Sequence, residues 1–288
     1  MKEITTTTLN NSLSNGINSL FSNLFSSLDN NVYAILDDLT FIDSDIYTDT
    51  SFAVLLSKSP ATGILLIAHS LILGFLIFYS LKLLLSSFYI INNLEKPSQF
   101  VFKLLFCAFF MNFSFDFCEL LINFTSTLSS SLRSLGESIF DCNMDFSTLV
   151  TKINIVLSFN SSIDIFSLDG VLKSIISVGF FNLIFTYSLR YIMIRVFILL
   201  APFATISLCH NSTSFLFKTW LKSFLSLLFI QILISVILLI TFTIVPADNM
   251  LLSKILYIGA IFALTKSNNF MKEIIGGIST TVNTNTAG

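Results

Sequence analysis

The amino-acid sequence predicts an all-α membrane protein, a polytopic bundle of about five transmembrane helices. Of the 288 residues, 54% are hydrophobic and only 11% are charged, whereas a soluble globular protein carries roughly 25% charged residues. Several apolar runs also reach or exceed the roughly 20 residues that a helix needs to cross a bilayer. The mean hydropathy of +0.84 agrees with both observations. The chain lacks the polar surface of a soluble protein and is expected to lie in a membrane.

Residues 1–60 are expected to form an extracytoplasmic amphipathic helix and an acidic connector. Apolar side chains between residues 5 and 28 recur at the three-to-four spacing of one helix face. The opposite face carries Asn and Ser, whereas helices that lie on lipid usually carry Lys and Arg there. Packing on a partner or on a neighbouring copy is therefore at least as good an explanation. Residues 29–58 contain six aspartates and predict a solvated connector with a short helix around residues 32–39.

Residues 61–124 are predicted to hold the first two transmembrane spans. The first span runs from Ala61 to about Ile91. A polar turn follows at residues 92–98, in which Pro97 is placed to begin the next helix. The second span is expected from Phe100 to Phe124.

The second predicted span carries a polar stripe. Its members are spaced by four, three and four residues, so they share one helix face at 3.6 residues per turn. Acidic residues within a span usually face the bundle or water and serve a function, which makes the stripe a candidate site. The alternative is that its two acids lie at the headgroup boundary, where ionisation costs little. The stripe consists of Asn112, Asp116, Glu119 and Asn123.

The remaining chain is divided by polarity. Residues 125–172 are too polar to cross a membrane and are predicted to form a large extracytoplasmic loop, a kind of segment that is usually functional or disordered. Residues 173–265 are predicted to hold the last three spans, and residues 266–288 form a cytoplasmic tail. Lys173 opens this part of the chain and is the predicted ion-pair partner of Asp116 or Glu119.

The positions of lysine and arginine select the topology, because these residues accumulate on the cytoplasmic side of membrane proteins. The apolar run at residues 173–209 could cross once as a long helix or twice as two short ones. One crossing gives five spans with the N-terminus outside and the C-terminus in the cytoplasm, and two crossings put several basic residues on the wrong face. The basic residues that one crossing places on the cytoplasmic side are Lys82, Lys96, Lys103, Arg190, Arg195, Lys218, Lys222, Lys266 and Lys272.

The stretch at residues 190–224 is predicted to form a basic elbow at the cytoplasmic surface. In the five-span topology its arginines lie near the inner headgroups, its proline ends the long third span, and its tryptophan anchors the next span at the interface. We expect this elbow to be a docking surface for a cytoplasmic partner. The candidate residues are Arg190, Arg195, Pro202, Lys218, Trp220 and Lys222.

Motifs for catalysis are absent from the sequence. There is no glycine-rich phosphate loop, no pair of histidines at metal spacing and no nucleophile–base–acid set. Cys107 and Cys118 lie eleven residues apart on one predicted helix, about 16 Å along its axis and too far for a disulfide. Cys142 and Cys209 are isolated in the sequence. We therefore expect no enzyme, no cofactor and no metal site.

Three short segments carry a resemblance to a known family. They are INSLFSNLFSSLDNNV in the predicted first helix, YIINNLEKPSQFVFKLLF around the first turn, and LLAPFATISL after Arg190. Together with an external N-terminus, five spans and a large loop between spans two and three, they resemble the TrbL-type channel subunit of conjugative type IV secretion systems, and its Gram-positive branch most of all. The similarity covers most of the chain by layout but only these segments by residue.

The resemblance implies a multi-copy channel component in the cell membrane, in contact with lipid and with other secretion-system subunits. The loop at residues 125–172 would lie near the transferred DNA or protein. This loop is acidic, whereas surfaces that hold DNA are basic, so we expect it to contact partner subunits and the transferred molecule only transiently. The family has no catalytic residues to carry over.

Two other functions fit the same residues. A small permease or transporter subunit could use the polar stripe together with Gln231, although the odd number of spans and the lack of an inverted repeat are unlike many transporters. A membrane accessory or immunity protein is the third alternative.

Overall fold

The computed structural model describes residue 16 and residues 30–56, 63–87, 96–157, 168–209, 213–244 and 250–276. Every regular element within these ranges is a helix. The amphipathic helix expected at residues 5–28 lies outside the described residues, apart from Gly16. The elements are α2 (Asn30–Thr40), η1 (Ser44–Tyr47), α3 (Thr50–Leu55), α4 (Ile64–Ser87), α5 (Pro97–Asn112), α6 (Ser114–Phe140), α7 (Phe146–Leu157), α8 (Leu168–Ile206), η2 (Ser207–Cys209), α9 (Ser214–Phe242) and α10 (Met250–Ile275).

Three stretches in the described part of the chain are long and apolar enough to cross a membrane. They are Ile64–Ser86 in α4, Gly170–Cys209 in α8 and η2, and Ser214–Phe242 in α9. The bent pair of α5 and α6 is a fourth if it counts as one span. These findings confirm the prediction of an all-helical protein with helices suited to a membrane.

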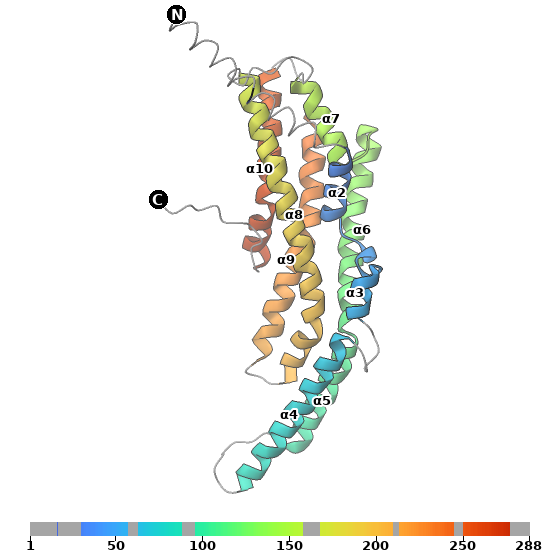
Figure 1. Cartoon of the computed structure of the whole chain (residues 1–288), viewed down its shortest axis with the longest axis vertical. Helices are drawn as coiled ribbons and strands as arrows, with labels where there is room; N and C mark the ends of the chain where they lie inside the picture. Colours follow the sequence, from blue (N-terminus) through green and yellow to red (C-terminus); the bar gives the residue numbers. More distant parts are fainter. Residues whose placement is uncertain are drawn as a thin grey trace, which may run out of the picture.

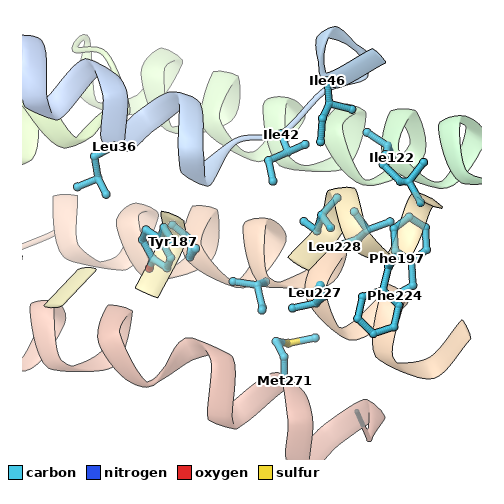
Figure 2. Close-up of a cluster of buried hydrophobic side chains, with 14 of the residues drawn as sticks. Leu36, Ile42, Ile46, Ile122, Tyr187, Phe197, Phe224, Leu227, Leu228 and Met271 are labelled. Carbon is cyan, nitrogen blue, oxygen red and sulfur yellow. The ribbon is translucent and has the colours of Figure 1, made fainter. Parts of the chain in front are cut away.

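The body of the molecule is a long bundle of α6, α8, α9 and α10 (Figure 1). The 39 residues of α8 make a rod about 58 Å long. Helices α6 and α9 run parallel, because Ser129 contacts Ser235 near their middle and Phe140 contacts Phe242 at their ends. Helix α8 is antiparallel to α9. Figure 2 shows side chains from these helices meeting in one apolar core.

Helices α4 and α5 form a hairpin that projects from one end of this bundle (Figure 1). The rings of Tyr79 and Phe100 stack across it with their centroids 3.8 Å apart. The thiol of Cys107, two thirds of the way along α5, contacts Cys209 at the end of η2. The preceding ten residues of α5, about 15 Å of helix, therefore extend past the end of α8.

The second span, expected as one helix from Phe100 to Phe124, is divided into α5 and α6, because the chain bends by 50° between them. At the bend the Ser114 hydroxyl donates to the Met111 carbonyl at 2.7 Å, and the Asn112 amide donates to the Ala108 carbonyl at 2.9 Å. Side chains that bond main-chain carbonyls compete with the helix and bend it. Phe113 lies at the break with φ −89° and ψ 0°.

Helix α6 continues through residues 125–140, which were expected to belong to a loop. Its polar residues do not prevent packing, because their hydroxyls are satisfied. Thr125 donates to the Leu121 and Ile122 carbonyls, and Ser129 bonds Ser235 at 2.7 Å. The helix ends at Asp141, whose φ of 50° is the left-handed conformation of a helix C-terminus. Polar composition was therefore a poor guide to this helix.

Pro202 does not end α8, contrary to the prediction. The helix continues to Ile206 and tightens into η2. A proline inside a helix removes one main-chain hydrogen bond, but this one lies only a turn from the helix end. The Thr205 hydroxyl donates to the Pro202 carbonyl at 2.7 Å, which satisfies an acceptor of the last turn.

Candidate functional site

Arg190 lies at the centre of the bundle and is fully buried. Its Nε donates to the Leu227 carbonyl of α9 at 2.8 Å, and its Nη1 donates to the Thr40 carbonyl of α2 at 2.7 Å. Thr40 is the last residue of α2, and the C-terminus of a helix carries partial negative charge. One cation therefore joins α2, α8 and α9 through main-chain atoms.

Gln231 is fully buried one helical turn from Leu227. Its Oε1 accepts a hydrogen bond from the Ile42 main-chain N–H at 3.0 Å. The Gln231 carbonyl accepts from Ser129 at 3.3 Å. Two donor atoms of this cluster, Arg190 Nη2 and Gln231 Nε2, have no hydrogen-bond partner among the described residues. We call Arg190, Gln231 and the main chain at Thr40 and Ile42 the core node.

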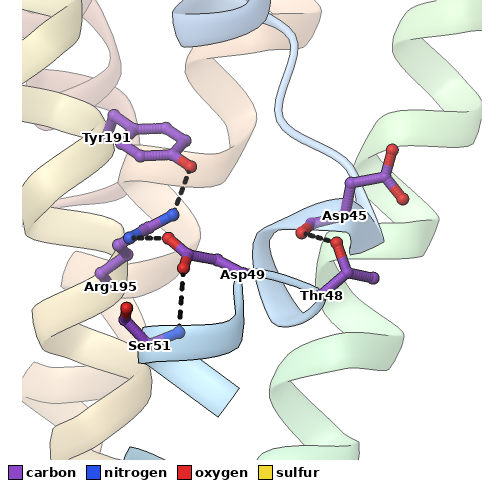
Figure 3. A network of polar contacts seen from close by, with 6 residues as sticks. All are labelled: Asp45, Thr48, Asp49, Ser51, Tyr191 and Arg195. Carbon is purple, nitrogen blue, oxygen red and sulfur yellow. Dashed lines mark hydrogen bonds and ion pairs between the residues drawn. The ribbon is translucent and has the colours of Figure 1, made fainter.

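Arg195 ties the same N-terminal region to α8 at a second point. Its Nη1 lies 2.9 Å from Asp49 Oδ2, and its Nη2 donates to the Tyr191 hydroxyl at 2.7 Å (Figure 3). Asp49 also accepts from the Ser51 N–H at the start of α3. The hydrogen bond from Arg195 holds the pKa of the Asp49 carboxyl below its ordinary value. We call residues 30–56 the N-terminal strap.

A third tie holds the strap to α7. The Asp37 carboxylate accepts from the Phe146 N–H at 3.3 Å, at the first residue of α7, where main-chain donors lack helical partners. Burial raises the pKa of Asp37 to about 7, and Asp145 and Asp38 add to the rise while the Phe146 N–H and Arg133 oppose it.

The predicted elbow is divided in the structure, and this corrects its prediction as one surface. Arg190 is inside the bundle and Pro202 is buried, so neither lies at a headgroup surface. Trp220 is also buried, donates through Nε1 to the Phe197 carbonyl at 2.9 Å and stacks on Phe224. A buried tryptophan with a satisfied N–H is a core residue. Of the six residues, Lys218 and Lys222 are exposed.

The polar stripe is interrupted by the bend. Asn112 ends α5, whereas Asp116, Glu119 and Asn123 lie on α6. Asn112 and Asn123 are exposed, and the two acids are half-buried beside the face that packs on the bundle. Gln231 bonds Ser129, six residues or about 9 Å beyond Asn123. The stripe and Gln231 do not converge on one site.

The predicted ion pair between Lys173 and the acids of α6 is wrong at the level of the backbone. Asp116 lies 13 residues before Ser129, which bonds Gln231, and Lys173 lies 17 residues before Arg190, which bonds Leu227. Since α6 and α8 run in opposite directions, the two positions are about 40 Å apart along the bundle. The sequence predicted that Asp116 and Lys173 both lie near the outer ends of their spans, because the second span was expected to end at Phe124.

The cysteines show a contact that the sequence did not indicate. Cys209, expected to be isolated, lies beside Cys107. Both thiols are buried and reduced. Sequence offers no sign of this contact, because 102 positions separate the two residues.

Within the described ranges, no group of three or more His, Cys, Asp or Glu side chains could hold a metal ion. The polar groups that the structure gathers instead hold the N-terminal strap to the bundle. Fold and site together define an all-helical protein with apolar helices suited to a membrane. No protein-family model, curated protein or solved structure matches the chain.

Proposed function

We propose that the protein is a channel or scaffold subunit of a conjugative type IV secretion machine in the cell membrane, where it helps to pass DNA or protein. Two supports stand behind the proposal. The first is the resemblance of three segments of the sequence to the TrbL-type subunit. The second is α4, whose apolar window has a mean hydropathy of 2.3 but is only 17% buried. An exposed apolar surface of this extent needs lipid or protein against it.

The proposed topology has five spans, with the N-terminus outside and the C-terminus in the cytoplasm. The spans are α4, the bent pair of α5 and α6, α8, α9 and α10. Support comes from the direction of the chain, which reverses from each of these units to the next (Figure 1). Lys82, Lys103, Lys218 and Lys222 then lie toward one end, as the accumulation of basic residues in the cytoplasm requires.

Lys218 and Lys222 form the proposed docking surface for a cytoplasmic partner subunit. Both are exposed near the start of α9. The rigid support beneath them is Trp220, which is fixed by its hydrogen bond to Phe197. Two cations on a firm surface favour an acidic partner. In this proposal several copies of the chain assemble in the membrane and contact the transferred molecule transiently.

The small-permease alternative has weaker support. It requires the polar stripe and Gln231 to line one substrate site, and the oxygen of Gln231 is already bonded to the strap at Ile42. An accessory or immunity protein needs no substrate site, so the structure does not separate this alternative from a secretion subunit. The phenotype of a strain that lacks the gene distinguishes the two.

The direct test is deletion of the gene followed by complementation in a mating assay. We expect transfer to fall by several orders of magnitude and to return with the wild-type chain. The double variant Lys218→Glu/Lys222→Glu should restore transfer poorly, and the matched control Lys272→Glu, an exposed lysine of α10, should restore it well. Intact transfer with loss of uptake of a solute would instead support a permease.

Topology has its own test, independent of transfer. A cysteine placed at Lys218 should react with a membrane-impermeant maleimide only after the cells are opened. Reaction in intact cells would overturn both the orientation and the cytoplasmic docking surface.

A further inference from the structure

The core node contains a buried positive charge that no described carboxylate balances. Arg190 is fully buried, and among the described residues it has no acidic partner, whereas Arg195 is paired with Asp49. Its acceptors are main-chain carbonyls. The C-terminus of α2 at Thr40 supplies the equivalent of only about half a negative charge. Because an unpaired charge is costly to bury, part of the charge of Arg190 still has to be balanced.

Two buried NH₂ groups of the core node also lack acceptors among the described residues. They are Arg190 Nη2 and Gln231 Nε2, and each carries two N–H donors. Both side chains are fixed on one short piece of main chain, since Arg190 bonds the Thr40 carbonyl and Gln231 bonds the Ile42 N–H. Side chains lean toward the N-terminus of their own helix. Because α8 and α9 are antiparallel, Arg190 and Gln231 therefore lean toward each other.

The missing partner has to be a hydrogen-bond acceptor, and its own donors distinguish water from an anion. A water molecule would bring two O–H donors that need further acceptors in the same core. The carbonyls of Thr40 and Leu227 already accept from Arg190. An anion brings no donor, and it balances the remaining charge. The chemistry of the node therefore favours an anion.

The packing around the core node favours an anion of a single atom. Leu36 lies one turn before Thr40 on α2, Tyr187 lies one turn before Arg190 on α8, and Leu228 follows Leu227 on α9. All three side chains are 1% exposed or less (Figure 2). A phosphate or a sulfate needs more room than a halide ion does.

We propose that the core node binds one chloride ion. The chloride accepts N–H bonds from Arg190 Nη2 and Gln231 Nε2 and balances the charge of the guanidinium. It stabilises the attachment of the N-terminal strap, because the same two side chains hold the strap at Thr40 and Ile42. The inference does not depend on the role that we propose for the chain in transfer.

The test uses the full chain, purified in a neutral detergent, in sodium chloride or in sodium gluconate at equal concentration. Gluconate keeps the ionic strength constant but is too large for the node. A ligand that binds only the folded state raises its stability as the ligand concentration increases. We expect the melting temperature, followed by the fluorescence of Trp220, to rise by about 5 °C as chloride replaces gluconate. Equal melting temperatures in the two salts would overturn the proposal.

The variant Gln231→Glu supplies the anion from within the protein. One carboxylate oxygen can still accept from the Ile42 N–H, and the other can pair with Arg190. We expect the chloride dependence to disappear and the melting temperature in gluconate to equal or exceed that of the wild-type protein. The matched control is Arg195→Gln, which removes an arginine that already has a carboxylate partner and should retain the chloride dependence. A chloride dependence that persists in Gln231→Glu, or that disappears in Arg195→Gln, would place the ion elsewhere and overturn the proposal.

Bromide locates the ion in the wild-type protein and requires no variant. Crystals grown in sodium bromide should show an anomalous scattering peak between Arg190 and Gln231. Density at this position without an anomalous signal would identify water, and bromide peaks confined to other positions would also refute the site. A strain that transfers normally without the gene would refute the transfer proposal and leave this one intact.

Discussion

The α4–α5 hairpin and the bundle of α6, α8, α9 and α10 are built from similarly apolar sequence but bury it very differently. The best window of α4 has a mean hydropathy of 2.3 and is 17% buried, whereas that of α9 has a mean hydropathy of 2.7 and is 56% buried. The mean hydropathy shows only that the side chains of both helices are unfavourable in water. In the bundle, other helices of the chain cover these side chains. In the hairpin, lipid or another protein must cover them.

Polar residues show the same division. The bundle contains Arg190, Gln231 and a pair of bonded serines, all buried. The exposed surface of the hairpin is dominated by leucine and phenylalanine. The hydrogen bonds that Arg190, Gln231 and the serines make between helices hold the bundle in one arrangement, so the bundle is expected to be the rigid region. The hairpin is held to it by a smaller contact, near Cys107 and Cys209.

The sharpest test of that contact is oxidation. Because the Cys107 and Cys209 thiols lie side by side, a mild oxidant should link them in the folded protein. Peptide mass spectrometry should detect the 107–209 crosslink, and Cys209→Ser should abolish it. The matched control is Cys142→Ser, which should leave the crosslink unchanged. A folded chain that yields no such crosslink would show that the hairpin docks elsewhere.

Arg190→Ala should have the largest effect on stability. The change leaves a cavity and removes the donors to the Thr40 and Leu227 carbonyls, at a cost of about 3–5 kcal/mol. Unfolding in detergent, followed by the fluorescence of Trp220, measures the loss. Arg190→Met fills most of the volume and should lose less, because a buried charge is also costly to hold. Equal stability of the alanine variant and the wild-type protein would contradict the stabilising role of Arg190 in the core node.

A pair of leucine substitutions compares the two regions directly. Leu228 of α9 is fully buried, and Leu73 of α4 is 63% exposed. Leu228→Ala should lower the free energy of unfolding by about 2–5 kcal/mol, and Leu73→Ala by less than about 0.5 kcal/mol. Both are measured in the same detergent. A large loss at Leu73 would mean that this face of α4 packs against protein, in a second copy or a partner.

The smallest expected effect is a pH dependence at Asp37. Its pKa is about 7 in the folded protein, above the ordinary value of 3.8, so the folded state binds the proton more tightly than the unfolded state. Stability should therefore increase as the pH falls from 8 to 5. Asp37→Asn should flatten this dependence and stabilise the protein at pH 8, because the variant has no carboxylate whose charge must be held in a buried position. Thermal melts across this pH range measure both.

An unchanged slope in Asp37→Asn would assign the pH dependence to other groups. Asp38 is the natural control, because it lies next in the chain but is exposed. Asp38→Asn should reduce the slope only slightly, because the Asp38 charge is the smallest of the charges that act on the pKa of Asp37.

The sequence was sufficient for the class of fold and for one helix boundary. Helix α5 begins at Pro97, as predicted. This boundary depends on a local signal, namely a proline at a helix start. The end of α6 was missed because serine and threonine can satisfy their hydroxyls within a helix and then pack as small residues.

The candidate sites were harder to predict, because their contacts connect distant parts of the chain. Arg190 meets Thr40 across 150 positions, and Gln231 meets Ile42 across 189. Local composition around Arg190 indicated an interfacial cation, and only the docking of the N-terminal strap reveals a buried one. Lys218 and Lys222, whose exposure follows from their own helix, could be predicted as surface residues.

The hydrogen-bond acceptors of Arg190 have a consequence for genetic experiments. Both are main-chain oxygens, which every amino acid at positions 40 and 227 would provide. A suppressor screen that starts from a defective Arg190 allele should therefore yield no charge-swap revertants at these two positions. The residues would also vary independently among related genes, so that comparison of sequences alone would overlook the contact that joins three helices.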